Sequence, residues 1–375
     1  MSKERGMIMH QCKTLLSAIS IQYPIIQAPM AGGVTTPELV AAVSNAGGLG
    51  SLGAGYLSPS KLRAEIKQIR RLTSKPFAVN LFIPEQPTHV DEKRLTELIG
   101  QLKPICDELG IDAEQLTIAY QDQFDEQFAV VVEEQVPVFS FTFGLLPSEK
   151  LEQCKKAGIF VMGTATTVHE AIQLEQLGVD AVVAQGSEAG GHRGTFAHAY
   201  HEAMIGTMAL VPQVADHVRV SVIAAGGIMD ARGIAASFAL GASAVQMGTA
   251  FIPCEESGAH PLYKQALIAS SEDRVAVTSS ITGKAVRGLR NRLMNLTEQL
   301  PETLPYPLQH VLTQHIHKAA AEQLRSEWMS MWAGQGIRLA RQQSAQELVK
   351  RLTEETDSII RMLKLYGVNK LNKQK

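Results

Sequence analysis

The chain is poor in aromatic residues, in cysteine and in net charge. Aromatic residues fill only 5% of its 375 positions, so the core must be built mainly from alanine, valine, isoleucine, leucine and methionine. Hydrophobic residues nevertheless reach 45% and charged residues 19%, which excludes a disordered chain and predicts a large folded core. The length allows one large domain with an addition, or two ordinary domains.

The near absence of net charge limits the partners. The formal charge is -2, from 35 basic and 37 acidic residues, and no long basic run interrupts the chain. Proteins that bind nucleic acid through its phosphates usually carry a basic excess, so no nucleic-acid partner is expected. No segment is apolar enough over a sufficient length to cross a bilayer, and no signal peptide is visible at the N-terminus. We therefore expect a cytoplasmic monomer or homodimer without a membrane partner.

The chain also lacks the patterns of metal and disulfide proteins. The four cysteines are Cys12, Cys106, Cys154 and Cys254. Their wide spacing, without a C-x-x-C pair, argues against a zinc site and a disulfide framework. Two histidine groups remain, at 198–202 and 315–317. The first lacks the H-E-x-x-H order, and the second places its two histidines on different sides of a predicted helix. No metal site is predicted.

Short apolar or β-branched runs alternate with helical patterns through most of the chain, as in a parallel sheet with crossover helices. The predicted strands are Ile25–Pro29, Leu49–Leu52, Phe77–Phe82, Val136–Phe143, Ile159–Gly163, Ala181–Ala184, Val220–Ala224 and Ala244–Met247. Eight buried parallel strands favour an α/β fold of the TIM (β/α)8-barrel class, although an open doubly wound sheet competes on spacing alone. Helix starts are predicted at Thr36–Glu38, Ser58–Ser60, Thr167 and Asp230.

Two segments exceed what a plain barrel needs. About 85–135 is too long for one crossover helix and predicts a helical insertion. After about Phe251 the strand signal largely stops and the remainder is helix-like. We therefore assign 1–252 to the barrel, with its insertion, and 253–375 to the last barrel helix plus a C-terminal helical cap.

One glycine pattern is misleading. The run Gly48–Gly53 matches G-x-G-x-x-G, but a helix precedes it and the glycines fall within a strand. A dinucleotide fingerprint requires the opposite order. These glycines are expected to allow close helix–strand packing.

The segment DAVVAQGSEAGGHRGTF carries the strongest sign of chemistry. Gln185 ends a predicted strand on the side where barrel active sites lie, and its amide can both donate and accept a hydrogen bond, as a flavin ring edge requires. His192 follows in a glycine-rich loop, where an imidazole can move protons at physiological pH. The neighbouring Arg193 allows two interpretations, an anion ligand or a solvated surface charge.

Two later loops predict a phosphate site. Gly226 and Gly227 form a turn between a strand and a helix starting at Ala231, so unpaired N–H groups and the helix dipole are available to an anion. The run Gln246–Thr249 ends the next strand. Loops after the last two strands hold phosphate in many barrels. Gln27–Met30 and Asn80 end two earlier strands on the same side.

The chain resembles the nitronate monooxygenase family in five segments, which occur in this order: PIIQAPMAGG, FAVNLF, AQGSEAGGHRG, AAGGI and QMGTAF. The resemblance covers roughly Tyr23 to Phe251, and PYPLQ and WAGQG near the C-terminus are similar to the same family. It implies an FMN-dependent barrel in which His192 matches the catalytic histidine. The expected FMN-binding residues are Gln27, Ala28, Met30, Asn80, Gln185, Gly190, Gly191, Gly226, Gly227, Gln246, Met247, Gly248 and Thr249.

The resemblance also implies a reaction. A nitronate such as propionate 3-nitronate would give one electron to FMN, and the flavin semiquinone and substrate radical would react with O2 to yield a carbonyl compound and nitrogen oxyanions. His192 would deprotonate a neutral nitroalkane or hydrogen-bond to a nitronate. Tyr306, Trp332 and Gln335 are the expected contributions of the cap. Flavin enoyl-acyl-carrier-protein reductases that use NAD(P)H share the loop elements, and a non-enzymatic flavin-binding barrel is a third alternative.

Overall fold

The computed structural model describes residues 15–85 and 90–372. Its centre is a parallel barrel of eight strands in the order β1-β9-β8-β6-β5-β4-β3-β2. The barrel strands are β1 (Ile25–Gln27), β2 (Gly50–Gly53), β3 (Phe77–Phe82), β4 (Val138–Thr142), β5 (Phe160–Ala165), β6 (Ala181–Gln185), β8 (Ser221–Ala225) and β9 (Ala244–Met247). A parallel bridge between Ile26 and Leu49 joins the two ends of this order. All eight predicted strands, and the closed barrel, are confirmed.

Seven crossover helices surround the strands in chain order: α2 (Pro37–Asn45), α3 (Pro59–Leu72), α5 (Phe124–Glu133), α6 (Ser148–Lys156), α7 (Val168–Leu177), α8 (Thr207–His217) and α9 (Ala231–Ala239). The predicted helix starts are confirmed by their caps. The hydroxyls of Thr36, Ser58 and Thr167 accept hydrogen bonds from the N–H groups of the first turns that follow them. These bonds satisfy donors that have no partner within a helix.

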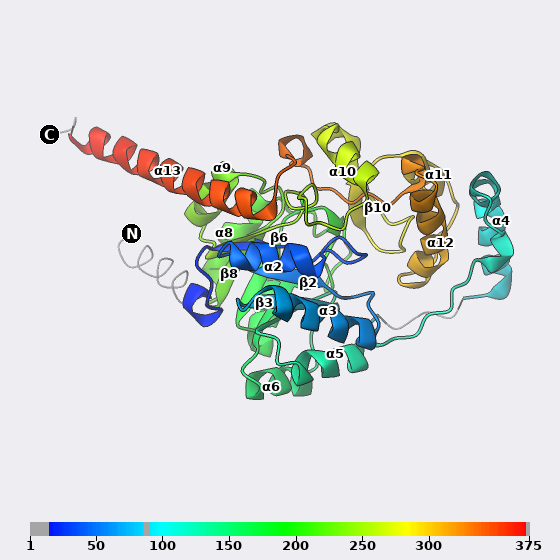
Figure 1. The fold of residues 1–375 in the computed structure, drawn as a ribbon, viewed down its shortest axis with the longest axis horizontal. Coiled ribbons are helices and arrows are strands. Elements are labelled where there is room, and N and C mark those ends of the chain that lie inside the picture. Colours follow the sequence, from blue (N-terminus) through cyan, green and yellow to red (C-terminus); the bar gives the residue numbers. More distant parts are fainter. Residues whose placement is uncertain (1–14, 86–89, 373–375) are drawn as a thin grey trace.

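The eighth barrel helix comes from the far end of the chain. Helix α13 (Ala345–Asn372) packs between α9 and α2, and Figure 1 shows it lying along the barrel with its C-terminal end projecting beyond it. Ala345, Leu348, Val349 and Leu352 are buried in the barrel core. The chain between β9 and α13 therefore forms a separate layer before it returns to complete the barrel.

That layer is a second hydrophobic core. It contains α10 (Pro261–Ile268), α11 (Arg292–Thr297) and α12 (Leu308–Glu322), and α4 (Glu92–Leu109) from the earlier insertion joins it. Leu102 and Ile105 of α4 share this core with Leu312 and Trp328. Figure 1 places these helices together beside the barrel. The two long additions to the chain thus meet and form one subdomain.

The C-terminal region also contains a small sheet that the sequence analysis did not predict. Strands β10 (Val275–Thr278) and β11 (Val286–Leu289) pair antiparallel, and β11 also pairs with β7 (Gly191–His192) from the glycine-rich loop. Four-residue strands carry too little periodicity to be recognised, and their pairing joins residues far apart in the chain. This small sheet ties the second core to the barrel mouth.

The glycines of 48–53 act as expected. A Cβ on Gly50 would lie 2.1 Å from the carbonyl oxygen of Val40 in α2, and one on Gly53 would lie 2.5 Å from the backbone nitrogen of Ala31. No side chain fits in either space. These glycines therefore allow close packing of the backbone, and they do not form a dinucleotide-binding fingerprint.

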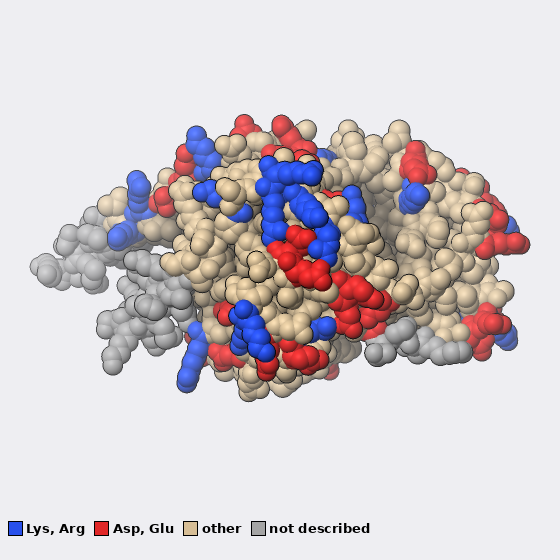
Figure 2. All heavy atoms as spheres, turned by 60° about the horizontal axis from the view of Figure 1, so that its bottom comes forward, with Lys and Arg blue, Asp and Glu red and all other residues tan. Residues whose placement is uncertain are grey.

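Opposite charges are mixed on the surface. The face in Figure 2 carries basic and acidic side chains next to one another instead of a uniformly basic area. Between α3 and the end of α5, for example, Arg63 and Arg70 both pair with Glu134, at 2.7 and 2.8 Å. No helix among the described residues is long and apolar enough to cross a membrane.

Candidate active site

A cavity of about 590 Å3 lies at the carboxyl-terminal ends of the barrel strands, under the second core. It brings together twelve of the thirteen predicted cofactor-binding residues and His192. The second core contributes Tyr263, Thr282, His310, His317 and Trp332 to the opposite wall. None of the side chains that line it is an aspartate, glutamate, lysine or arginine, so neutral polar and apolar groups form the walls.

The remaining predicted cofactor residue, Gln27, does not line the cavity. Its side chain is fully buried, accepts a hydrogen bond from Ser51 N (2.9 Å) and donates one to Ser51 O (3.1 Å). Gln27 therefore joins β1 to β2 where the barrel closes. Of the three residues expected from the cap, Trp332 lines the cavity, whereas Tyr306 lines an adjoining cavity of about 250 Å3 and Gln335 lines neither.

His192 is held by the second core as much as by the barrel. Its backbone pairs with Val286 of β11, and Arg193 N donates to Ala285 O (2.9 Å). The ring centroid lies 5.7 Å from those of Phe143 and Tyr306 and 6.3 Å from that of Trp332. His192 Nε2 lies 3.0 Å from Thr282 Oγ1. The imidazole is thus placed in an aromatic enclosure with one polar partner.

This enclosure determines the charge of His192. Burial, with smaller electrostatic contributions from His310 and Lys284, lowers the pKa of His192 to about 3. Desolvation disfavours the charged imidazolium because little water can reach it. In the free protein His192 is therefore neutral at physiological pH, with one ring nitrogen able to accept a proton.

The glycine-rich loop is held by internal hydrogen bonds. The Gln185 amide accepts from Gly194 N (2.8 Å) and donates to His192 O (3.0 Å), so it fixes the loop that carries the histidine.

Both sequence interpretations of Arg193 were wrong. Its side chain is buried and donates to the carbonyl oxygens of Gly186 (2.6 Å), Gln185 (3.0 Å) and Ala203 (3.3 Å). Unpaired carbonyls of an irregular buried loop need such a donor.

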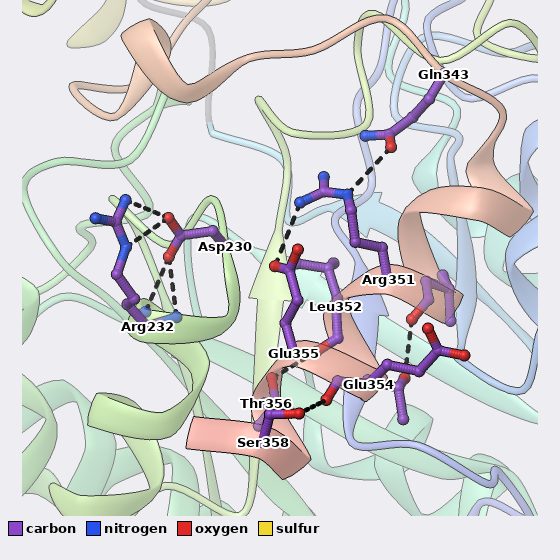
Figure 3. Close-up of polar contacts among 12 residues, drawn as sticks. Asp230, Arg232, Gln343, Arg351, Leu352, Glu354, Glu355, Thr356 and Ser358 are labelled. Carbon is purple, nitrogen blue, oxygen red and sulfur yellow. Dashed lines mark hydrogen bonds and ion pairs between the residues drawn. The ribbon is translucent and has the colours of Figure 1, made fainter. Parts of the chain in front are cut away.

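The predicted phosphate site needs one correction. The N–H groups of Arg232 and Gly233, at the start of α9, are taken by the Asp230 carboxylate, as the close-up in Figure 3 shows. The end of this helix is therefore closed to a second anion, because a carboxylate already caps it.

The turns before it remain available. Gly226 and Gly227 have φ of 111° and 71°, a conformation that glycine adopts without strain, and both line the cavity. Within the described parts of the chain, no acceptor is found for the backbone N–H groups of Gly227, Gly248 and Thr249. Unpaired amides in adjoining turns can bind an anion without any side-chain charge.

Comparison with known proteins fits this arrangement. The family model described as nitronate monooxygenase matches residues 13–355. A probable nitronate monooxygenase of Staphylococcus haemolyticus is 47% identical over 353 residues, covering 93% of this chain and 98% of the relative. One from Staphylococcus aureus is 44% identical, with 92% and 98% coverage. The chain belongs to the nitronate monooxygenase family.

Solved structures support the same relationship. The nitroalkane oxidase of Streptomyces ansochromogenes has a TM-score of 0.86 and 39% identity, covering 93% of this chain and 99% of that one. FabK from Thermotoga maritima has a lower TM-score of 0.74 and 31% identity, with 94% and 98% coverage. The chain is thus an oxidoreductase whose similarity to the nitroalkane oxidase exceeds its similarity to FabK.

Sequence reasoning missed the wall that α12 adds to this family's barrel. His310, Gln314, His317 and Ala321 line the cavity at intervals of four, three and four residues, which is the spacing of one helix face. The sequence carried this signal, because the same spacing is visible in LQHVLTQHIHKAAAE. His317 also contacts Ser330, with Oγ 2.8 Å from Nε2. Burial lowers the pKa values of both His310 and His317 to about 4.

The lowered pKa values of His192, His310 and His317 predict a stability that depends on pH. The unfolded chain binds protons on them near pH 6.5, whereas the folded chain resists protonation until about pH 3 to 4. Between these pH values the unfolded state binds more protons than the folded state. The free energy of unfolding is therefore highest above about pH 6.5 and falls as the pH drops toward 4. The slope is at most about 1.4 kcal/mol per pH unit for each histidine.

Urea unfolding over a pH series measures this effect. His317→Gln removes one of the three groups and should make the decline less steep, whatever its effect on stability at neutral pH. The control His201→Asn changes an exposed histidine and should keep the original slope. Equal slopes for His317→Gln and the unmodified protein would contradict the assignment.

Proposed function

We propose that this protein oxidises alkyl nitronates of the propionate 3-nitronate type with O2, using FMN bound in the cavity and His192 as the chemical base. The products would be a carbonyl compound and nitrogen oxyanions. One observation carries the proposal above the others. A neutral, half-buried imidazole lines the same cavity as two glycine turns with unpaired amides.

The cavity has the features that FMN requires. The amides of Gly227, Gly248 and Thr249 would bind the phosphate, since they have no other acceptor and no acidic side chain lines the site. Asn80 and Gln246, near the ends of β3 and β9, can offer amide groups to a ring edge, and Asn80 is oriented by a 2.9 Å bond to Ser140 Oγ. When bound, FMN supplies the redox chemistry that the side chains lack.

The protein's own groups would position the substrate and handle its proton. His192 can take a proton from a neutral nitroalkane or donate a hydrogen bond to an anionic nitronate. An imidazole with a pKa of about 3 is a weak base, which favours a substrate that is already ionised. The rings of Phe143, Tyr306 and Trp332 would keep water from the reacting atoms.

Anaerobic mixing tests the proposal against its main alternative. If propionate 3-nitronate bleaches the absorbance of the bound flavin without NADH, the nitronate reaction is supported. The second candidate is an NAD(P)H-dependent enoyl-acyl-carrier-protein reductase, because the sequence shares loop elements with that class. Bleaching by NAD(P)H alone would establish that candidate instead. Purified protein that contains no flavin and binds none would contradict both candidate functions.

We also propose a cytoplasmic location. Cys106, Cys154 and Cys254 are buried and unbonded in the structure, whereas Cys12 lies outside the described residues. Free thiols that are far apart suit a reducing compartment.

A further inference from the structure

The hydroxyl of Thr282 is the polar partner of His192, and it comes from the second core. Thr282 lies between β10 and β11, and its residue is 1% exposed. Its Oγ1 is 3.0 Å from His192 Nε2 and 2.9 Å from the carbonyl oxygen of Lys284. The backbone N–H of Lys284 also points to this oxygen, at 3.4 Å.

One arrangement of the protons satisfies all three contacts. A hydroxyl has one hydrogen to donate, and a carbonyl oxygen can only accept. In that arrangement the Thr282 hydrogen goes to Lys284 O, which leaves the lone pairs of the hydroxyl oxygen facing the imidazole. Nε2 of His192 must then carry the hydrogen of that contact, because two lone pairs at 3.0 Å would repel each other. The neutral ring consequently has its free lone pair on Nδ1.

We propose that Thr282 is a positioning residue that holds His192 as the Nε2–H tautomer, so that Nδ1 is the atom that accepts the substrate's proton. The role in proton transfer rests on the proposed function, whereas the tautomer does not. After proton uptake at Nδ1, the Nε2–H bond to Thr282 remains in place, so the ring needs no rotation. Within the described chain, no carboxylate forms a hydrogen bond or an ion pair with His192. The Thr282 hydroxyl therefore orients the imidazole without raising its pKa, as a carboxylate partner would.

The surroundings of Thr282 explain its precise placement. Gly283 follows with φ of 83°, and a Cβ there would lie 2.4 Å from Leu304 O, so the loop is pressed against the segment that leads to Tyr306. Lys284 extends over the Phe143 ring, 4.7 Å from its centroid, and forms an ion pair with Glu85. The catalytic ring of the barrel would thus take its orientation from a loop of the second core.

Nitrogen NMR of the histidine rings tests the tautomer directly. The FMN-bound protein is labelled with 15N in histidine, and the His192 signals are assigned by their loss in His192→Gln. At neutral pH we expect a protonated Nε2 and an unprotonated Nδ1 in the unmodified protein, and a mixed or reversed pattern in Thr282→Val. Thr282→Ser retains the hydroxyl and should retain the pattern. A protonated Nδ1 in the unmodified protein would overturn the proposal without any variant.

Steady-state kinetics test whether the orientation of His192 by Thr282 affects proton transfer from the substrate. With a neutral nitroalkane, Thr282→Val should lower kcat/KM on the order of 10-fold or more, because part of the base's contribution is lost with its orientation. Thr282→Ser should restore the value, and the nitronate should be less affected. Thr356→Val is a matched control, since Thr356 is a buried threonine whose hydroxyl donates to Leu352 O within α13, on the outside of the barrel (Figure 3).

The outcomes separate the two proposals. An unchanged tautomer and unchanged kinetics in folded Thr282→Val would overturn the positioning role, whatever the substrate. The expected tautomer in a protein that does not oxidise nitronates would leave the positioning of His192 intact and remove the proposed function instead. If Thr282→Val does not fold, the unmodified protein and Thr282→Ser still decide the tautomer.

Discussion

Replacement of His192 by alanine is expected to lower the turnover of neutral nitroalkanes roughly 100-fold, at the lower end of a general base's usual contribution, because an imidazole with a pKa of about 3 is a weak base. The reason is that the side chains around His192 offer no substitute. Phe143 and Trp332 cannot take a proton, and burial raises the pKa of Tyr306 well above its usual range. FMN should stay bound, because the amides assigned to its phosphate belong to Gly227, Gly248 and Thr249.

Steady-state rates with a neutral nitroalkane and with its nitronate, together with the flavin absorbance after gel filtration, measure the effect. The nitronate already lacks the proton, so its rate should fall less. His201→Ala, which changes an exposed histidine outside the cavity, is the control. Full turnover of the neutral substrate by His192→Ala would remove His192 from the proposed role.

Substitution of Gly248 by valine is expected to weaken FMN binding strongly while the chain still folds. A Cβ at this position would meet Ala28 Cβ at 3.5 Å and Met30 Sδ at 3.7 Å, which are ordinary contacts. The remaining side-chain atoms would occupy the turn where the phosphate is proposed to lie. Hydrogen bonds to a charged group contribute about 1.5–3 kcal/mol each, so the loss of two weakens binding roughly 100-fold or more.

The comparison is with Gly100→Ala. Gly100 lies exposed inside α4, and a Cβ there meets nothing within 4 Å. This variant should bind FMN normally and gain about 0.5–1 kcal/mol in stability, because alanine favours a helix interior over glycine. Flavin content after dialysis and thermal unfolding of the flavin-free protein measure both properties. A Gly248→Val protein that retains FMN would show that the phosphate binds elsewhere.

Local sequence patterns predicted the barrel well. Each strand is a short buried run bounded by turn residues, and each of the four predicted helix starts has a side chain that caps its own first turn. These signals lie within a few residues of the structures they specify. The glycine turn at Gly226–Gly227 belongs to the same class, since a positive φ is a property of the residue itself.

Arg193 and Asp230 show where this reasoning fails. A charged residue in a sequence does not reveal whether carbonyl groups surround it, as they do Arg193, or whether it occupies the helix end that an anion would need, as Asp230 does. Both outcomes depend on the path of the backbone. The same holds for α13, whose apolar face gave no sign that it packs against α2 and α9 at the start and end of the barrel.

The sequence by itself determined the eight buried strands, the loops that end them and the presence of a histidine in one of those loops. Only the tertiary structure decided the environment of that histidine: the pairing of β7 with β11, the aromatic rings around it and the Thr282 hydroxyl at its Nε2. The physical reason is distance along the chain. Caps and turns are local interactions, whereas His192 and Thr282 are 90 residues apart and meet only because two cores pack together.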